Sequence, residues 1–161
     1  MWAYETTFYQ IYPLGFCGAP RENAAPVAED ELAQAANAAP NPDAPIMKIA
    51  QWADYLQKLG VDAIWLTPFY VSPQVDNGYD VANYTAIDPT YGTLDDFDEL
   101  VARAHERGIR IVLDMVFNHT STQHAWFRES LNKESPYRQF YIWRDGTPEL
   151  LPNNWRSKFG G

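Results

Sequence analysis

An apolar stretch of this sequence turns polar at the point where a buried strand would end. Residues 111–113 are apolar, Asp114 follows them, and Asn118 and His119 come shortly after. The carboxylate and the imidazole could form an acid–base pair, and the amide could bind a substrate, a loop backbone or a metal. The alternative is structural: Asp114 caps or cross-links neighbouring loops, and His119 is a hydrogen-bonded core histidine. Spacing alone leaves both interpretations open.

A second polar cluster consists of Asp76, Asn77, Gly78 and Tyr79. Asp-Asn-Gly is ordinary turn chemistry, which is its structural interpretation. Its functional interpretation is a tight turn that presents a carboxylate to sugar hydroxyls and an aromatic ring to a sugar face.

No metal site is predicted. His119 and His124 are separated by a strand-to-loop break at a spacing that is not typical of metal ligands. Cys17 is the single cysteine of the chain, so the sequence has neither a disulfide framework nor a cysteine-rich metal site.

The elements that must position these clusters alternate between strands and helices. Apolar runs predict strands over residues 8–12, 61–68 and 109–116. Helices are predicted over residues 46–60 and 93–108, and each ends at a glycine. This order is typical of βαβ units and a parallel sheet, so the fold class is α/β. Function gathers beyond the carboxyl ends of such strands, where both polar clusters fall.

The two helices carry apolar residues at helical spacing, which predicts their buried faces. Thr93 and Asp96 form the pattern of a capping box at the start of the second helix. A shorter helix is expected over residues 125–131, and 69–91 are expected to be loop. The predicted buried residues are Ile46, Ile49, Ala50, Ala53, Leu56, Leu94, Phe97, Leu100, Val101 and Ala104.

Composition excludes several functional classes. The chain has 161 residues, 46% of them hydrophobic, which suits one globular domain. Its net charge of -9, without any Lys/Arg stripe, argues against nucleic-acid binding. No apolar run is long enough to span a bilayer, and the first residues lack the pattern of a signal peptide. We therefore expect a cytoplasmic protein without membrane partners.

Six motifs in order along the chain resemble the α-amylase superfamily, glycoside hydrolase family 13. Within that family they are most similar to the α-glucosidase and oligo-1,6-glucosidase group. Only the Ala/Pro-rich stretch 19–45, read as a long loop with one helical turn around 29–36, falls outside the resemblance. The motifs are "YQIYP" (9–13), "GVDAIWLTP" (60–68), "DNGYDVANY" (76–84), "IDPTYGTLDDF" (87–97), "VLDMVFNHTSTQHAWF" (112–127) and "PNNWRSKFGG" (152–161).

The resemblance implies a (β/α)8 TIM barrel. Residues 1–119 would form its first three βα units, and residues 120–161 would begin a small domain inserted after the third strand. It also implies a retaining hydrolase of terminal α-glucosidic bonds, with an α-glucoside or a short α-glucan as substrate. The two catalytic carboxylates of this family lie on strands four and five, so we expect none within the chain. The missing C-terminal part of the barrel would supply them.

The resemblance assigns roles to residues of both clusters. Asp76 would hold the far hydroxyls of the terminal glucose, Tyr79 would stack on that sugar, and His119 would bind its 6-hydroxyl. Asp114 would orient an arginine on the next strand, and Asn118 would brace the loop.

The chain departs from the glucosidase pattern after "YQIYP". Leu14, Gly15 and Phe16 stand where the glucosidase group has Arg-Ser-Phe and then an Asp-rich calcium loop, so no calcium or other cofactor is expected. This start resembles a different amylase branch.

Two alternatives remain for the function. One is a non-catalytic relative, like the glucosidase-like heavy chains of amino-acid transporters. The other is a family member that isomerises or transfers glucose, such as sucrose isomerase, trehalose synthase or amylosucrase.

Overall fold

The computed structural model describes residues 1–19, 39–147 and 152–155. The chain divides into two compact units, Met1–Ala125 and Trp126–Gly161, and each is described by itself. The helical turn expected around 29–36 lies outside the described residues. No helix in the described ranges has the length and apolar character that crossing a membrane requires.

A three-stranded parallel sheet forms the centre of the first unit. Its strands are β1 (Phe8–Ile11), β2 (Ala63–Leu66) and β5 (Arg110–Leu113), in the order β1-β2-β5. Their last residues are aligned in register, so the three carboxyl ends meet at one edge. The α/β class and the parallel sheet are thus confirmed, with strands shorter than predicted.

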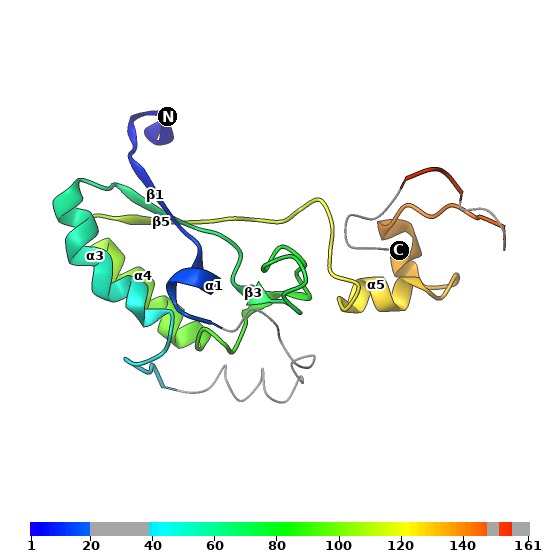
Figure 1. Cartoon of the computed structure of the whole chain (residues 1–161), viewed down its shortest axis with the longest axis horizontal. Helices are drawn as coiled ribbons and strands as arrows, with labels where there is room; N and C mark the ends of the chain where they lie inside the picture. The colour runs from blue at the N-terminus through cyan, green and yellow to red at the C-terminus, as the bar shows by residue number, and fades with distance from the viewer. Residues whose placement is uncertain (20–38, 148–151, 156–161) are drawn as a thin grey trace. The chain divides into compact units, whose positions relative to one another are not determined.

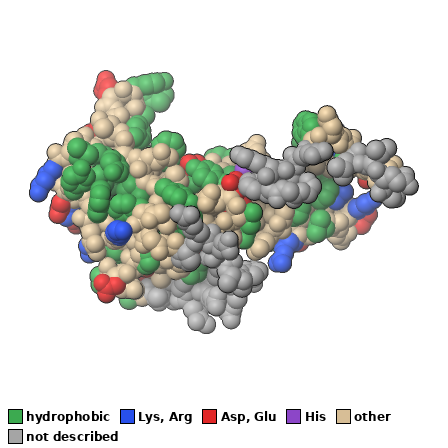
Figure 2. All heavy atoms as spheres, viewed as in Figure 1, with side chains coloured by type: hydrophobic (Ala, Val, Ile, Leu, Met, Phe, Trp, Pro, Cys, Tyr) green, Lys and Arg blue, Asp and Glu red, His purple; other side chains and the backbone are tan. Residues whose placement is uncertain are grey.

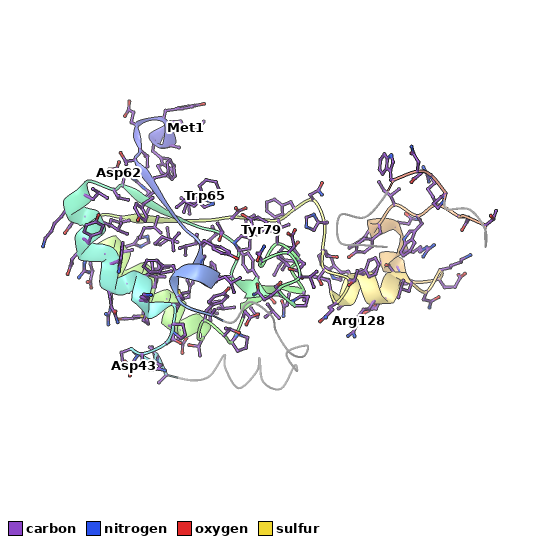
Figure 3. All side chains as sticks on the ribbon, in the orientation of Figure 1. Met1, Asp43, Asp62, Trp65, Tyr79 and Arg128 are labelled. Atoms are coloured by element: carbon purple, nitrogen blue, oxygen red, sulfur yellow. The ribbon has the colours of Figure 1, made fainter. Side chains whose placement is uncertain are left out.

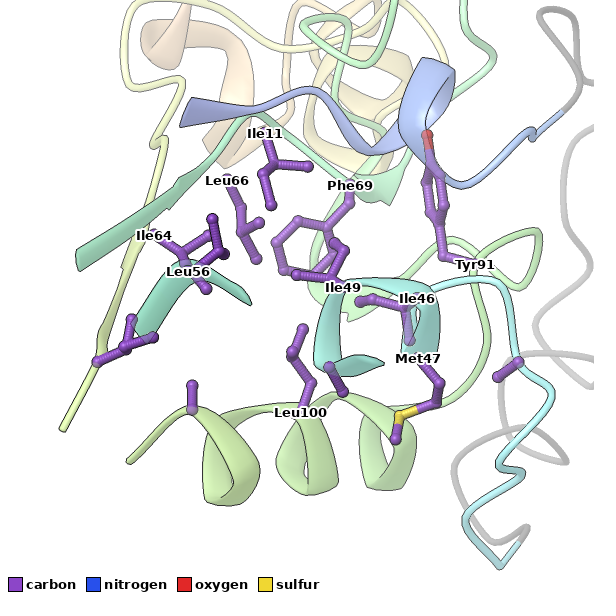
Figure 4. Packing of buried hydrophobic residues seen from close by; sticks show 14 of the residues in the cluster. Ile11, Ile46, Met47, Ile49, Leu56, Ile64, Leu66, Phe69, Tyr91 and Leu100 are labelled. Atoms are coloured by element: carbon purple, nitrogen blue, oxygen red, sulfur yellow. The ribbon is translucent and has the colours of Figure 1, made fainter. Parts of the chain in front are cut away.

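Two helices cover one face of this sheet (Figure 1): α3 (Met47–Leu59) and α4 (Leu94–Glu106). Gly60 ends α3 in the left-handed conformation, and the predicted capping box of Thr93 and Asp96 begins α4. The helices and the sheet bury one apolar cluster (Figure 4). Its labelled members are Ile11, Ile46, Met47, Ile49, Leu56, Ile64, Leu66, Phe69, Tyr91 and Leu100.

Two short elements precede the first crossover. They are the 3-10 helix η1 (Trp2–Glu5) and the single helical turn α1 (Pro13–Phe16), which follows β1 directly. Pro13 at the first position of α1 stops the strand and starts the turn, because its fixed φ suits a helix start. The chain therefore bends sharply at the carboxyl end of β1.

The prediction of a loop over residues 69–91 is wrong in part. β3 (Tyr70–Val71) and β4 (Asn83–Ile87) pair there as an antiparallel ribbon with an irregular register. β3 has only two residues, which is too short to show the alternation by which strands are predicted. Contacts distant in sequence hold the ribbon: Tyr70, Val81 and Val116 form a second buried cluster.

Four burial predictions also need correction. Leu94 is exposed because it is the first residue of α4, whereas Asp96 is buried by its capping contacts. Asp114, expected inside a buried strand, lies just after β5 and is half-buried. Phe97 and Val101 are half-buried rather than buried.

The second unit is a small aromatic assembly around α5 (Ala125–Ser130) and the 3-10 helix η2 (Pro136–Phe140). The Arg138 guanidinium lies 3.7 Å from the centre of the Trp143 ring and donates a hydrogen bond to the Ser130 carbonyl. The predicted helix over 125–131 is confirmed, one residue shorter. The other ring contacts join Trp126, Phe127, Tyr137, Phe140 and Tyr141.

Candidate functional site

A cavity of about 530 Å³ opens beside the carboxyl ends of the strands. Three of its six lining residues follow β1 in the sequence, and the other three belong to the loop between β3 and β4. The volume lies within the range of small-molecule pockets. The lining residues are Tyr12, Leu14, Gly15, Asp76, Asn77 and Tyr79.

The Asp-Asn-Gly sequence forms a tight turn, as its composition predicts. The Tyr79 amide donates to the Asp76 carbonyl at 2.9 Å, and Asn77 and Gly78 have φ values of 53° and 95°. Gly78 also approaches Pro68 so closely that an added Cβ would lie 2.7 Å from the Pro68 carbonyl oxygen. The turn is therefore packed directly against the segment that follows β2.

Tyr79 joins the two polar clusters that the sequence singles out. Tyr79, which Figure 3 labels, donates a hydrogen bond from its hydroxyl to Asp114 Oδ2 at 3.0 Å and lines the cavity. Burial, then the hydrogen bond to Asp114 and the charges of Asp114 and Asp76, raise the pKa of Tyr79 to about 12. Tyr79 is consequently a neutral phenol at physiological pH, held in place from the carboxyl end of β5.

His119 contacts Tyr79 from the backbone side. Its Nε2 lies 3.0 Å from the Tyr79 carbonyl oxygen, which only accepts hydrogen bonds, so Nε2 carries the proton. Nδ1 then accepts from the Asn118 amide at 3.2 Å. The Tyr84 hydroxyl, 2.5 Å from the Val116 carbonyl and 2.8 Å from that of His119, fixes this segment to β4. His119 is exposed and does not line the cavity.

The structure therefore brings all five predicted site residues into one contact network. Asp76 and Tyr79 line the cavity, and Asp114 holds Tyr79. Asn118 holds the ring of His119, which contacts the backbone of Tyr79. The resemblance implies that an arginine beside Asp114 would come from a later strand; within the described residues, the Asp114 carboxylate accepts a hydrogen bond from Tyr79.

Sequence reasoning missed Tyr12, Leu14 and Gly15 as cavity residues and Asp80 as a loop residue. The first three could have been found, because they follow a predicted strand at the edge where the polar clusters gather. Asp80 could not, since its role depends on hydrogen bonds formed only in the folded loop. Within the described ranges, no group of three or more His, Cys, Asp and Glu residues is placed to hold a metal ion.

Comparisons with known proteins agree on one family. The model for the α-amylase catalytic domain matches residues 10–161. The trehalose-6-phosphate hydrolase of Escherichia coli K12 is 88% identical over 113 residues, which are 70% of this chain and 20% of that protein. The oligo-1,6-glucosidase of Halalkalibacterium halodurans is 44% identical over 161 residues, which are 99% of this chain and 25% of that protein.

Solved structures give the same result. The crystal structure of isomaltulose synthase from Erwinia rhapontici matches with a TM-score of 0.76 at 40% identity, covering 100% of this chain and 26% of that one. The chain thus spans a fifth to a quarter of the length of these relatives, and its three-stranded sheet is part of a TIM-barrel fold. It belongs to the α-amylase catalytic-domain family, glycoside hydrolase family 13.

Proposed function

We propose that this chain supplies the glucose-binding pocket of a retaining hydrolase that acts on terminal α-glucosidic bonds of short α-glucans or α-glucosides. The observation that carries the proposal is the cavity at the carboxyl edge of the sheet, which an aspartate and a tyrosine, Asp76 and Tyr79, line together. A carboxylate accepts hydrogen bonds from neighbouring sugar hydroxyls, and an aromatic ring packs against the apolar face of a pyranose.

Each site residue has a distinct part in this proposal. Asp76 holds the far hydroxyls of the terminal glucose, and Tyr79 stacks on it. His119 binds the 6-hydroxyl, for which its exposed ring must exchange one of its present contacts, the Tyr79 carbonyl or the Asn118 amide. Asn118 orients that ring, and Asp114 orients both Tyr79 and an arginine of a later strand. The nucleophile and the acid–base carboxylate, which retaining enzymes hold about 5–5.5 Å apart, come from other strands of the barrel.

The proposed domain organisation assigns residues 1–119 to the first three βα units of the barrel. Residues 120–161 begin the small domain inserted after the third strand. The division of the chain into compact units between Ala125 and Trp126, a few residues beyond this proposed boundary, supports it.

The identity of 88% to the E. coli trehalose-6-phosphate hydrolase makes trehalose-6-phosphate the first substrate to test. No Lys or Arg lines the cavity among the described residues, whereas Asp76 does. A phosphate group is therefore repelled from this pocket, and the unphosphorylated glucose of such a substrate occupies it. A second candidate is isomerisation of a disaccharide, which the similarity to isomaltulose synthase favours.

The test uses a hybrid enzyme in which this chain is joined to the remaining part of the E. coli relative. The hybrid should hydrolyse an aryl α-glucoside and trehalose-6-phosphate with release of glucose. Asp76→Ala should lower kcat/KM about a hundredfold, because misplacement of the sugar alone has that effect. Asp98→Ala, which removes an exposed carboxylate on α4, is the matched control.

An unchanged rate for Asp76→Ala would contradict the pocket assignment. Rearranged disaccharide as the main product, instead of free glucose, would favour the isomerase candidate. The 161-residue chain by itself should release no aryl group, and protein-dependent release would contradict the placing of the catalytic acids outside it.

A further inference from the structure

We propose that Asp80 is the positioning residue of the pocket. Its carboxylate holds the loop 72–80 in the conformation that presents Asp76 and Tyr79 to the sugar. This inference rests on the proposed function for what the two side chains bind, but the anchoring itself is independent of any substrate.

The Asp80 carboxylate accepts three hydrogen bonds from the loop that precedes it. Oδ1 accepts from the Ser72 hydroxyl at 2.8 Å and from the Asp76 amide at 3.0 Å. Oδ2 accepts from the Val75 amide at 2.9 Å. The Asp80 carboxylate thus connects Ser72, at the start of the loop, to Asp76, which lines the cavity. Charged acceptors form the stronger class of hydrogen bond, which suits this function.

The loop needs such an anchor because its backbone is strained. Gln74 and Asn77 have φ values of 63° and 53°, and these are the two non-glycine residues with positive φ among the described residues. Asn adopts this conformation readily in turns but Gln rarely does, so at Gln74 it persists only where surrounding contacts enforce it. The hydrogen bond from Ser72 to Asp80 spans both Gln74 and Asn77, and the one from Asp76 to Asp80 spans Asn77.

Asp80→Asn is the sharpest perturbation, since it keeps the shape of the side chain and removes one acceptor. If the amide oxygen keeps Ser72 and Asp76, the NH2 group faces the Val75 amide, and two donors oppose each other. In the flipped orientation two acceptor contacts are lost instead. Either way, at least one loop donor loses its partner, and the loop relaxes toward unstrained φ values.

Amide hydrogen exchange in the full chain tests the anchoring without any substrate. Asp80→Asn should speed exchange of at least one of the Val75 and Asp76 amides about tenfold, the effect of losing one hydrogen bond. Amides in the middle of α3 should exchange at the unchanged rate, which shows that the fold is retained. Equal exchange at Val75 and Asp76 in both proteins would overturn the proposal.

A double-mutant cycle in the hybrid enzyme tests the positioning. Asp80→Asn should lower kcat/KM at least tenfold when Asp76 is present, and by a smaller factor in the Asp76→Ala background, where only the positioning of Tyr79 is left to lose. Asp98→Asn, which removes an exposed charge of the same kind, should have no effect in either background. Equal losses in both backgrounds would show that Asp80 does not act through Asp76, and would overturn the proposal.

The two experiments also separate this inference from the proposed function. A hybrid enzyme that cleaves no α-glucoside would contradict the proposed function, and the exchange rates would still decide whether Asp80 anchors the loop.

Discussion

Replacing Gly78 with alanine tests whether the turn beside the cavity depends on close packing or only on a glycine conformation. Gly78 has φ +95°, and an added Cβ would lie 2.7 Å from the Pro68 carbonyl oxygen. Gly60 is the matched control, because it has φ +81° and nothing within 4 Å of an added Cβ. Both substitutions place an L-residue in the left-handed region, at about 1–2 kcal/mol. Only Gly78→Ala must also move backbone, at about 1–3 kcal/mol more.

We therefore expect Gly60→Ala to lower the free energy of unfolding by about 1–2 kcal/mol and Gly78→Ala by about 2–5 kcal/mol. Urea unfolding followed by circular dichroism measures both values, and equal slopes of the two transitions make them comparable. In the hybrid enzyme, Gly78→Ala should also lower kcat/KM, because the displaced backbone carries Tyr79, whereas Gly60→Ala should not. Equal losses of stability in the two variants would refute the argument that the Pro68 contact matters.

Three further outcomes follow from the fold. Thr93→Ala removes the capping box of α4 and should lower the free energy of unfolding by about 1 kcal/mol, measured by urea unfolding against the exposed Thr122→Ala. Leu100→Ala, at a fully buried position, should lower it by about 2–5 kcal/mol in the same assay; a smaller loss would mean that the helix layer is loosely packed. Burial lowers the pKa of His124 from 6.5, so the unfolded state binds this proton more readily and stability should fall below about pH 6.5. A pH series of thermal midpoints for the protein and for His124→Gln checks this, and an identical pH dependence in both would contradict it.

Local patterns predicted the helices and strands of the first unit well, because each is set by neighbouring residues. The capping box of Thr93 and the glycine at 60 act within one turn, and both lie where the sequence placed them. The β3–β4 ribbon was missed since its pairing depends on Tyr70 and Val81, which meet Val116 only in the folded protein.

The candidate site was predictable to the extent that it follows strand ends. Asp76, Tyr79 and Asp114 come after strands that any parallel sheet would align at one edge. The partners of these residues were not predictable, because contacts such as Tyr79 to Asp114 span 35 positions of sequence. The hydrogen bonds of Asp80 were not predictable either, because they form only when the loop has folded.

The first unit exposes hydrophobic side chains on two faces: the outer side of α3 and the side of the sheet opposite the helices. Hydrophobic side chains on the outer side of α3 are exposed (Figure 2), among them Trp52, Tyr55 and Leu59. Trp65 points away from the helices, between Gln10 and Val112 in register, and is 38% exposed (Figure 3). Parallel sheets are normally covered on both faces, and in a TIM barrel the inner side chains pack into layers contributed by several strands.

The face around Trp65 is therefore the one that the other strands of a barrel cover, in agreement with the small share of its relatives that this chain spans. The pocket, in contrast, does not need other strands of a barrel to complete its internal hydrogen bonds. The hydrogen bonds that Asp80 accepts from Ser72 and Asp76, and the one that Tyr79 donates to Asp114, all lie within the described residues. The proposed sugar-binding part of the site is thus assembled by the first unit alone, while the inner face of its sheet is left for the strands to which the proposed function assigns the catalytic carboxylates.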